Sequence, residues 1–206
     1  MTLTVLSSFV LTAFLLNLSP GPSILYVMSR SVVNGRAAGV FAALGLASGS
    51  AMWALLTAIG VSALIASSRP AFVTLQIAGA AYLLYLGITG LRDQPFTVTT
   101  DKAARVSGLR SYLQGFVVEA TNPKTVTFFL ALVPQVIVTL HHPGLPVLIG
   151  FCLIVPLTAL PIDVTVGVTG GTLATKLAAR PRAGRALNYL SSAVLIGLAS
   201  LVLFDV

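Results

Sequence analysis

The chain has 206 residues, of which 56% are hydrophobic and 8% are charged, and its formal net charge is +7. A soluble domain carries about 25% charged residues, so this composition excludes a soluble protein and predicts an all-α membrane protein. The positive residues lie in short clusters between apolar runs and do not form the basic face that binds nucleic acid. We therefore expect membrane lipid, and no nucleic acid, around the chain.

The apolar runs predict six transmembrane helices, because a spanning helix needs roughly 20 apolar residues. The first run has no positive segment before it of the signal-peptide type, so we expect it to be the first span of the protein. The second run is longer than one crossing requires, which predicts a tilted or bent helix. The predicted spans are about 3–28, within 37–68, about 72–91, 112–140, 146–169 and 186–204.

The predicted spans form two halves of three helices within a single transmembrane transporter domain, 1–206. The first repeat covers about 1–93, a polar loop covers about 94–110, and the second repeat covers about 111–206. Spans one and four each contain a short polar patch with proline. Because three helices per half make the halves insert in opposite directions, the pattern predicts two inverted repeats, which transporters commonly use.

The basic residues predict the orientation of the chain. Apart from Arg69 and Lys124, all of them fall in the first, third and fifth predicted loops. The positive-inside rule places these loops in the cytoplasm and both termini outside it. The residues are Arg30, Arg36, Arg92, Lys102, Arg105, Arg110, Lys176, Arg180, Arg182 and Arg185.

The fourth predicted span holds a carboxylate, an amide, a proline and an ammonium within six residues: Glu119, Asn122, Pro123 and Lys124. Pro123 has no N–H, so we expect the carbonyl of Glu119 to lose its helical partner. Free backbone groups and charges are costly in hydrocarbon, and they persist mainly where they face a cavity or a partner. These residues are therefore candidates for a substrate or ion pathway.

A comparable break lies in the first span, in the sequence NLSPGP that begins at Asn17. Pro20 and Pro22 are expected to free the carbonyls four residues before them, and Gly21 to accommodate a distorted backbone. Freed carbonyls could bind an ammonium group, and the start of the resumed helix could bind a carboxylate. The alternative is a plain proline kink.

Glu119 and Asp163 are the carboxylates placed inside the predicted spans. With a rise of 1.5 Å per residue, each lies roughly 9–10 Å from the middle of its span on the cytoplasmic side. We expect both to face the interior at matched depth, where a carboxyl can exchange a proton. The alternative is an ion pair of either acid with Lys124. Asn17 and Asn122 lie within about 6 Å of their span centres, where an amide suits a zwitterion or links two helices.

Small residues recur four positions apart in and before the second span, which predicts close packing of helix backbones. The same residues could serve a homo-oligomer interface, although the sequence does not indicate one. The pairs are Gly35 and Gly39, Gly45 and Gly49, and Ala47 and Ala51.

The two polar motifs together resemble the LysE/RhtB family of bacterial amino-acid exporters. The first runs from Asn17 to Pro22; the second is Asn122-Pro123-Lys124, followed by Phe128-Phe129 and Pro134-Gln135. The resemblance covers essentially the whole chain. It implies a secondary exporter of amino acids or their derivatives in the bacterial plasma (inner) membrane, driven by the proton gradient.

The resemblance also bears on which acid carries the proton. Glu119 stands where many members of that family have an uncharged residue. Asp163 lies two residues after Pro161, which frees backbone near it. Asp163 is therefore the preferred proton carrier.

Other function classes have less support in the sequence. The alternative is a cation or metal-ion exporter, for which two intramembrane carboxylates are a thin ligand set. An enzyme is not indicated, because HExxH and GxSxG motifs and histidines within the spans are missing. The single cysteine, Cys152, excludes a cysteine-built metal site, and we expect neither a metal nor a cofactor.

Overall fold

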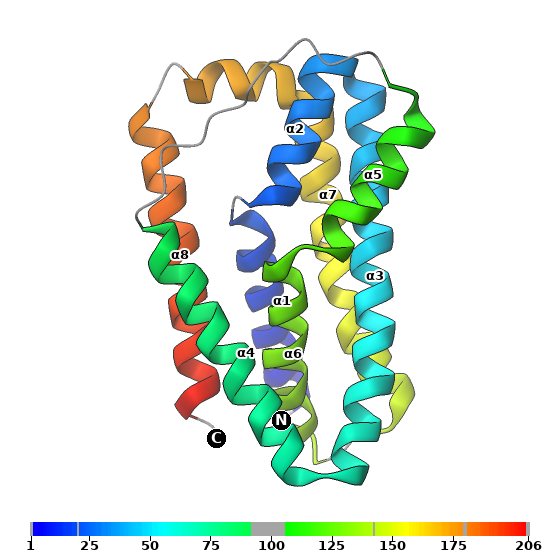
Figure 1. The fold of residues 1–206 in the computed structure, drawn as a ribbon, viewed down its shortest axis with the longest axis vertical. Coiled ribbons are helices and arrows are strands. Elements are labelled where there is room, and N and C mark those ends of the chain that lie inside the picture. Colours follow the sequence, from blue (N-terminus) through cyan, green and yellow to red (C-terminus); the bar gives the residue numbers. More distant parts are fainter. Residues whose placement is uncertain (1, 20, 92–105, 142, 179–180, 205–206) are drawn as a thin grey trace.

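The computed structural model describes residues 2–19, 21–91, 106–141, 143–178 and 181–204, and these residues form eight α-helices without any strand. The helices run mostly along the long axis of the bundle (Figure 1). The predicted all-α architecture is confirmed for the described residues. The helices are α1 (Thr2–Leu18), α2 (Pro22–Asn34), α3 (Arg36–Ser67), α4 (Arg69–Gly90), α5 (Gly108–Ala120), α6 (Pro123–Thr139), α7 (Leu145–Ala178) and α8 (Pro181–Phe204).

Two of the described helices are long and apolar enough to cross a membrane alone: Arg36–Gly60 within α3 and Leu145–Thr172 within α7. The pairs α1–α2 and α5–α6 reach the required length only together, and they are bent by 51° and 50°. Shorter apolar stretches occur in α4, at Ile77–Thr89, and in α8, at Ser192–Phe204. The described helices thus give two to four candidate spans, and the six-span inverted repeat stays a prediction.

Each bent pair consists of two separate helices, and proline explains why. Pro22 stands in the first turn of α2, and Pro123 stands in the first turn of α6. Proline fits there because the first N–H groups of a helix have no intrahelical partner. It cannot continue the preceding helix, because it clashes with that helix and donates no hydrogen bond. Pro20, also predicted to break the chain here, lies outside the described residues.

The helix after the predicted loop 94–110 begins earlier than expected. Residues 92–105 lie outside the described part of the chain, and α5 already begins at Gly108. The hydroxyl of Ser107 accepts a hydrogen bond from the backbone N–H of Arg110, at 3.3 Å. This serine cap satisfies one of the free donors of the first turn, so the helix begins there.

Helix α3 lies between α5 and α7 and packs closely against both (Figure 1). At the contact with α7, a Cβ atom at Gly39 would lie 2.7 Å from the carbonyl oxygen of Gly167. At the contact with α5, a Cβ atom at Gly49 would lie 2.9 Å from the carbonyl oxygen of Phe116. These small residues let backbones touch within one chain. A homo-oligomer interface stays a prediction.

The buried apolar residues form two clusters. The small cluster joins α2, α3 and α7; the large cluster joins α1, α3, α4, α6, α7 and α8 and includes Phe9, Leu16 and Phe128. The first half of the α1–α2 pair contributes to the large cluster and the second half to the small cluster, so the helix break lies between them. The small cluster consists of Val27, Met28, Ala42, Ala43, Leu46 and Val166.

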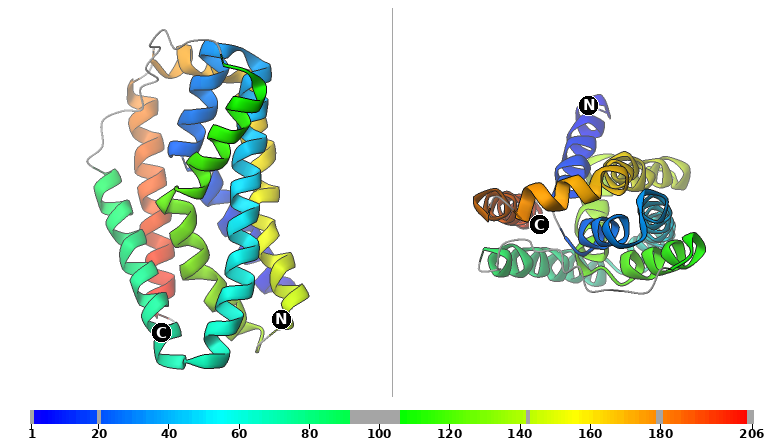
Figure 2. Two further views of the ribbon diagram at one scale, coloured as in Figure 1. Left: turned by 45° about the vertical axis from the view of Figure 1, so that its right-hand side comes forward. Right: turned by 90° about the horizontal axis from the view of Figure 1, so that it is seen from above.

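The start of α1 and the end of α8 lie at the same end of the bundle (Figures 1 and 2). The connection between α3 and α4 also lies at this end, and Arg69 is the first residue of α4; α2 ends and α3 and α5 begin at the other end. Arg36 opens α3, and Arg110 stands in the first turn of α5. The basic residues of these elements therefore gather away from the termini. That the termini face outward stays a prediction.

Candidate functional site

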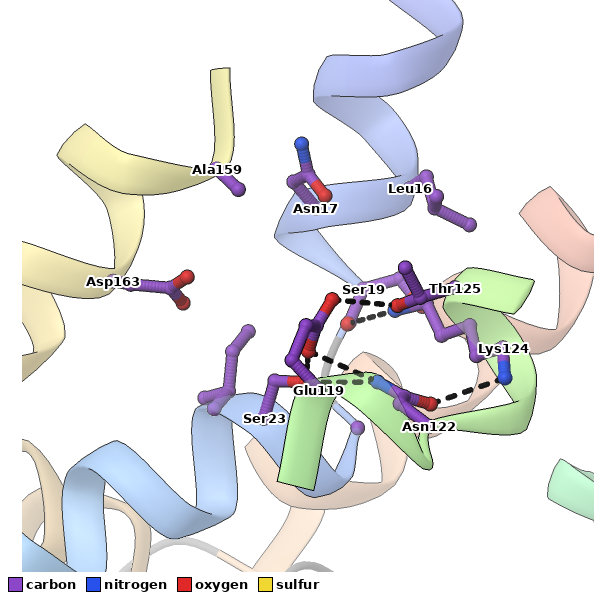
Figure 3. A pocket seen from close by; sticks show the side chains of 12 residues that line it. Leu16, Asn17, Ser19, Ser23, Glu119, Asn122, Lys124, Thr125, Ala159 and Asp163 are labelled. Carbon is purple, nitrogen blue, oxygen red and sulfur yellow. Dashed lines mark hydrogen bonds between the residues drawn. The ribbon is translucent and has the colours of Figure 1, made fainter. Parts of the chain in front are cut away.

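The two helix breaks meet at one cavity of about 30 Å³ between α1, α2, α5, α6 and α7 (Figure 3). The volume suffices for about one or two water molecules and is far below the roughly 300–1,000 Å³ of a typical small-molecule pocket. Six of the nine sequence-predicted site residues lie here. The lining residues are Leu16, Asn17, Ser19, Gly21, Ser23, Ile24, Glu119, Asn122, Lys124, Thr125, Ala159 and Asp163.

Glu119, near the end of α5, is the centre of a hydrogen-bond network that joins both breaks. Its side chain is 7% exposed. Its carboxylate accepts from the hydroxyl of Ser23 at 2.5 Å, from the hydroxyl of Thr125 at 2.7 Å, and from the Asn122 amide at 3.4 Å. Because Ser23 belongs to α2 and Thr125 to α6, one carboxylate ties three helices together.

Asn122 is the N-cap of α6 and is almost fully buried. Its Oδ1 accepts from the backbone N–H of Lys124 at 3.0 Å, and its Nδ2 donates to the hydroxyl of Ser23 at 2.8 Å. Asparagine is favoured at this position because its side chain satisfies a free donor of the first turn. The amide therefore starts α6 and also links it to α2.

Lys124 reaches across to the other break. Its ammonium donates to the carbonyl of Ser19, at the end of α1, with an N–O distance of 2.6 Å (Figure 3). Within the described part of the chain, it forms no ion pair with Glu119 or Asp163 at 4 Å or less. The predicted alternative, a direct ion pair of Lys124 with an acid, is therefore not what the structure shows.

Two of the three carbonyls expected to be free, those of Leu16 and Glu119, are paired locally, so for these two the prediction is wrong. The carbonyl of Leu16 accepts from the backbone N–H of Ser19 at 3.1 Å, and that of Glu119 accepts from the N–H of Asn122 at 3.1 Å. Each helix tightens its last turn with such a bond. The carbonyls that accept from side chains belong to later residues. The carbonyl of Ser19 accepts a hydrogen bond from the ammonium of Lys124, and that of Ala120 accepts from the indole N–H of Trp53 at 3.0 Å.

Asp163 lies on α7, is 6% exposed, and points from that helix into the cavity (Figure 3). Its charged neighbours are Glu119 and Lys124. No hydrogen bond to its carboxylate is found among the described residues. The structure thus brings both intramembrane acids to one cavity from different helices, as the depth estimate requires. Whether either acid carries a proton stays a prediction.

Asn17 holds the end of α1 against α7. Its Nδ2 donates to the carbonyl of Val155 at 3.1 Å and to the hydroxyl of Thr158 at 3.0 Å. Both bonds are between helices, so this asparagine links two helices, which was one of the two roles predicted for it. It also lines the cavity.

Gly21 does not have the backbone role that its sequence position suggests. Its φ of −156° and ψ of −172° are extended values that any residue adopts. A Cβ atom there would lie 3.6 Å from the side chain of Lys124, which is an ordinary contact. The expectation of a distorted, glycine-dependent backbone is therefore wrong. Gly21 is instead the N-cap of α2, and it brings no side chain to cap that helix.

Sequence reasoning missed Ser23 and Thr125, which complete the network around Glu119. Both stand in the first turn of the helix that follows a break. A hydroxyl at that place, next to an intramembrane acid, is the signal that could have found them. Reasoning from the sequence also missed Trp53, because its partner at Ala120 lies on another helix.

Packed regions of the bundle lie on both sides of the cavity. Toward the start of α3, the hydroxyl of Tyr26 donates to the carbonyl of Ser111 at 2.8 Å, and the guanidinium of Arg30 donates to Gln114 at 2.8 Å. These bonds and the small apolar cluster join α2 to its neighbours. Toward the termini, the large apolar cluster packs the helices together.

A buried charged cavity between two broken helices of an apolar bundle is the arrangement of a membrane transporter, in which helix breaks supply polar groups at mid-depth. The comparison with known families agrees: the LysE type translocator family is matched over residues 14–205, and the chain belongs to this family. The resemblance found in the two sequence motifs is confirmed.

The chain is similar to individual membrane proteins as well as to the family as a whole. The homoserine/homoserine lactone efflux protein of Salmonella typhimurium is 34% identical over 184 residues, which cover 88% of this chain and 87% of the relative. The leucine efflux protein of Salmonella choleraesuis is 32% identical over 142 residues, 66% of each chain. An uncharacterized membrane protein of Pseudomonas aeruginosa is 30% identical over 92% of this chain and 90% of its own. No solved structure matches the chain.

Proposed function

We propose that the protein is a proton-coupled secondary exporter of amino acids or amino-acid derivatives in the bacterial inner membrane. The observation that carries this proposal is the cavity where Glu119, Lys124 and Asp163 meet between the two helix breaks. The relatives named for efflux of homoserine, homoserine lactone and leucine point to the same substrate class. For the same reason the alternative of a cation or metal-ion exporter is not favoured.

The cavity offers complementary groups to both ends of an amino acid. The carbonyl of Ser19 already accepts from an ammonium, that of Lys124, so a substrate ammonium can take the same place when the lysine moves aside. The first turn of α2 starts at Gly21 without a side-chain cap, and Ser23 and Ile24 of that turn line the cavity. Free N–H groups at a helix start attract a carboxylate.

Transport then requires the cavity to widen and to open to one side at a time. Opening toward the start of α3 separates α2 from α5 at the Tyr26 and Arg30 bonds and at the small apolar cluster. Opening toward the termini separates parts of the large cluster. We propose that the six predicted spans form two inverted repeats that rock about the breaks, with both termini outside the cytoplasm.

Asp163 is the proposed proton carrier. Glu119 is already the acceptor for three side chains, so a change in its protonation disturbs the network that joins the breaks. Among the described residues, Asp163 has no such hydrogen bonds, and its carboxyl can gain and lose a proton as the cavity opens to each side. Intramembrane acids that face a cavity commonly mark proton pathways.

The test is transport in proteoliposomes that contain homoserine or leucine and carry an imposed pH gradient. We expect Asp163→Asn, which cannot release a proton, to abolish accumulation against the substrate gradient while exchange of labelled for unlabelled substrate continues. Asp101→Asn, in the predicted loop, is the matched control and should behave like the parent. If Asp163→Asn accumulates substrate as well as the parent does, proton coupling through Asp163 is wrong; if the parent moves no amino acid, the substrate class is wrong.

A further inference from the structure

A second pocket, of about 260 Å³, lies between α1, α6 and α8 in the half of the bundle that contains the chain ends. Half of its lining side chains are polar and uncharged, and none of them is charged. Polar groups are costly in hydrocarbon unless they are hydrogen-bonded, so five polar side chains around one pocket indicate contact with water or a polar ligand. The polar lining residues are Thr4, Ser8 and Thr12 of α1 and Gln135 and Thr139 of α6.

The polar residues form two facing stripes. Residues four apart on a helix lie on one face, so Thr4, Ser8 and Thr12 follow one line along α1, and Gln135 and Thr139 follow another along α6. The hydroxyl of Ser8 donates to the Thr4 carbonyl at 2.9 Å, and that of Thr139 donates to the Gln135 carbonyl at 2.7 Å. With its hydrogen engaged in this way, each hydroxyl oxygen keeps lone pairs to accept from a ligand.

The pocket and the central cavity are neighbours along α1. Along α1, Thr12 of the pocket and Leu16 of the cavity are one turn apart, about 6 Å. The ring of Phe9, which lines the pocket, packs against Phe128 at 6.2 Å and against Phe151 at 5.7 Å between ring centroids.

We propose that this pocket is an outer binding site that receives the exported solute after it leaves the central cavity, and that it takes a net-neutral, zwitterionic amino acid. The inference rests on the proposed function and narrows its substrate class. Hydroxyl and amide groups can bind both ends of a zwitterion, whereas a cationic side chain would meet no counter-charge there. The volume is close to the lower end of the range for small-molecule sites, about 300 Å³.

The test is modification of single cysteines by a membrane-impermeant thiol reagent added outside cells. The background is Cys152→Ala, because Cys152 is the only native cysteine, is buried and lines neither space. Ser8→Cys and Thr12→Cys place a thiol in the pocket. Val10→Cys is the matched control, since Val10 lies two residues from each, about 200° around the helix, and is 37% exposed on the other face.

We expect Ser8→Cys and Thr12→Cys to be modified at least about tenfold faster than Val10→Cys, because thiols react as thiolates and need water. Leucine or homoserine should slow the modification, lysine should not, and modified protein should lose efflux. Equal rates at all three positions, or rates that no neutral amino acid changes, would overturn the proposal and indicate a pocket filled by lipid or by water alone. Modification and protection in a protein that exports nothing would leave the site standing and contradict the proposed function instead.

Discussion

The two broken helices have nearly the same bend, 51° and 50°, but their breaks are built differently. At the α5–α6 break, Asn122 caps the second helix, and the indole of Trp53 satisfies the carbonyl of Ala120 at the end of the first. At the α1–α2 break, Gly21 gives α2 no side-chain cap, and the carbonyl of Ser19 is satisfied by Lys124, which belongs to α6.

The difference assigns distinct roles to the two breaks. The α5–α6 break is completed by its own Asn122 and by Trp53 of α3, and we expect both to keep these bonds during transport. The α1–α2 break takes its partners from across the cavity, namely Lys124 on Ser19 and Glu119 on Ser23. Polar groups of a substrate can take the place of Lys124 at Ser19 and of Glu119 at Ser23. We therefore expect changes at the α5–α6 break to act mainly on stability, and changes at the start of α2 to act mainly on transport.

The largest effect is expected from Glu119→Ala, because Glu119 serves both breaks. The change removes the acceptor of the Ser23 and Thr125 hydroxyls, and each buried unsatisfied group costs about 1–3 kcal/mol; Asn122 keeps its bond to Ser23. Efflux should be lost, and thermal unfolding in detergent should occur at a lower temperature. Glu119→Gln keeps one acceptor oxygen and should be less destabilised. An alanine variant as stable as the parent would show that the network does not hold the breaks together.

A cap introduced at the start of α2 should reduce transport without reducing stability. Gly21→Asp places a carboxylate where we expect that of the substrate, so efflux should fall by about tenfold, equivalent to about 1.4 kcal/mol. The free energy of unfolding should stay the same or rise, since a cap contributes up to about 1 kcal/mol. Gly21→Ala is the control: the backbone is extended and a Cβ fits, so it should export normally. Equal efflux by the two variants would remove the proposed carboxylate site.

Removal of the Asn122 cap at the α5–α6 break should reduce stability more than transport. Asn122→Ala loses the acceptor for the N–H of Lys124, which should lower the free energy of unfolding by about 1 kcal/mol, with a smaller loss of efflux than in Gly21→Asp. Asn122→Asp keeps the capping oxygen and serves as the comparison, measured by thermal unfolding and by efflux at matched abundance. A variant that is fully stable but inactive would place substrate binding at this break as well.

The smallest effect is expected from Trp53→Phe, which keeps an aromatic ring but removes the donor to the Ala120 carbonyl. The free energy of unfolding should fall by about 1 kcal/mol, the usual contribution of one hydrogen bond. Efflux at matched abundance should remain close to that of the parent. A severe transport defect in this variant would mean that the end of α5 moves during the cycle, contrary to the fixed role assigned to that break.

The positions of the breaks could be predicted from the sequence because proline acts locally: Pro22 and Pro123 each open a new helix where the spans were expected to be interrupted. Depth along a helix is also local, so the rise per residue predicted similar depths for Glu119 and Asp163, which line one cavity in the structure. The partners of Lys124 and Ser23 could not be predicted, because they depend on how far α2 and α6 rotate and cross. Packing across the whole bundle sets those angles.

Trp53 is the only tryptophan of the chain, so all tryptophan fluorescence of the protein comes from this residue. The indole lies against the large apolar cluster, with its N–H on the Ala120 carbonyl, a few residues from the cavity-lining Glu119 and Asn122. Intrinsic fluorescence of the unlabelled protein therefore reports on one known place. A change in emission on mixing with an amino acid would time the opening of the bundle in a rapid-mixing instrument, with Trp53→Phe as the dark reference.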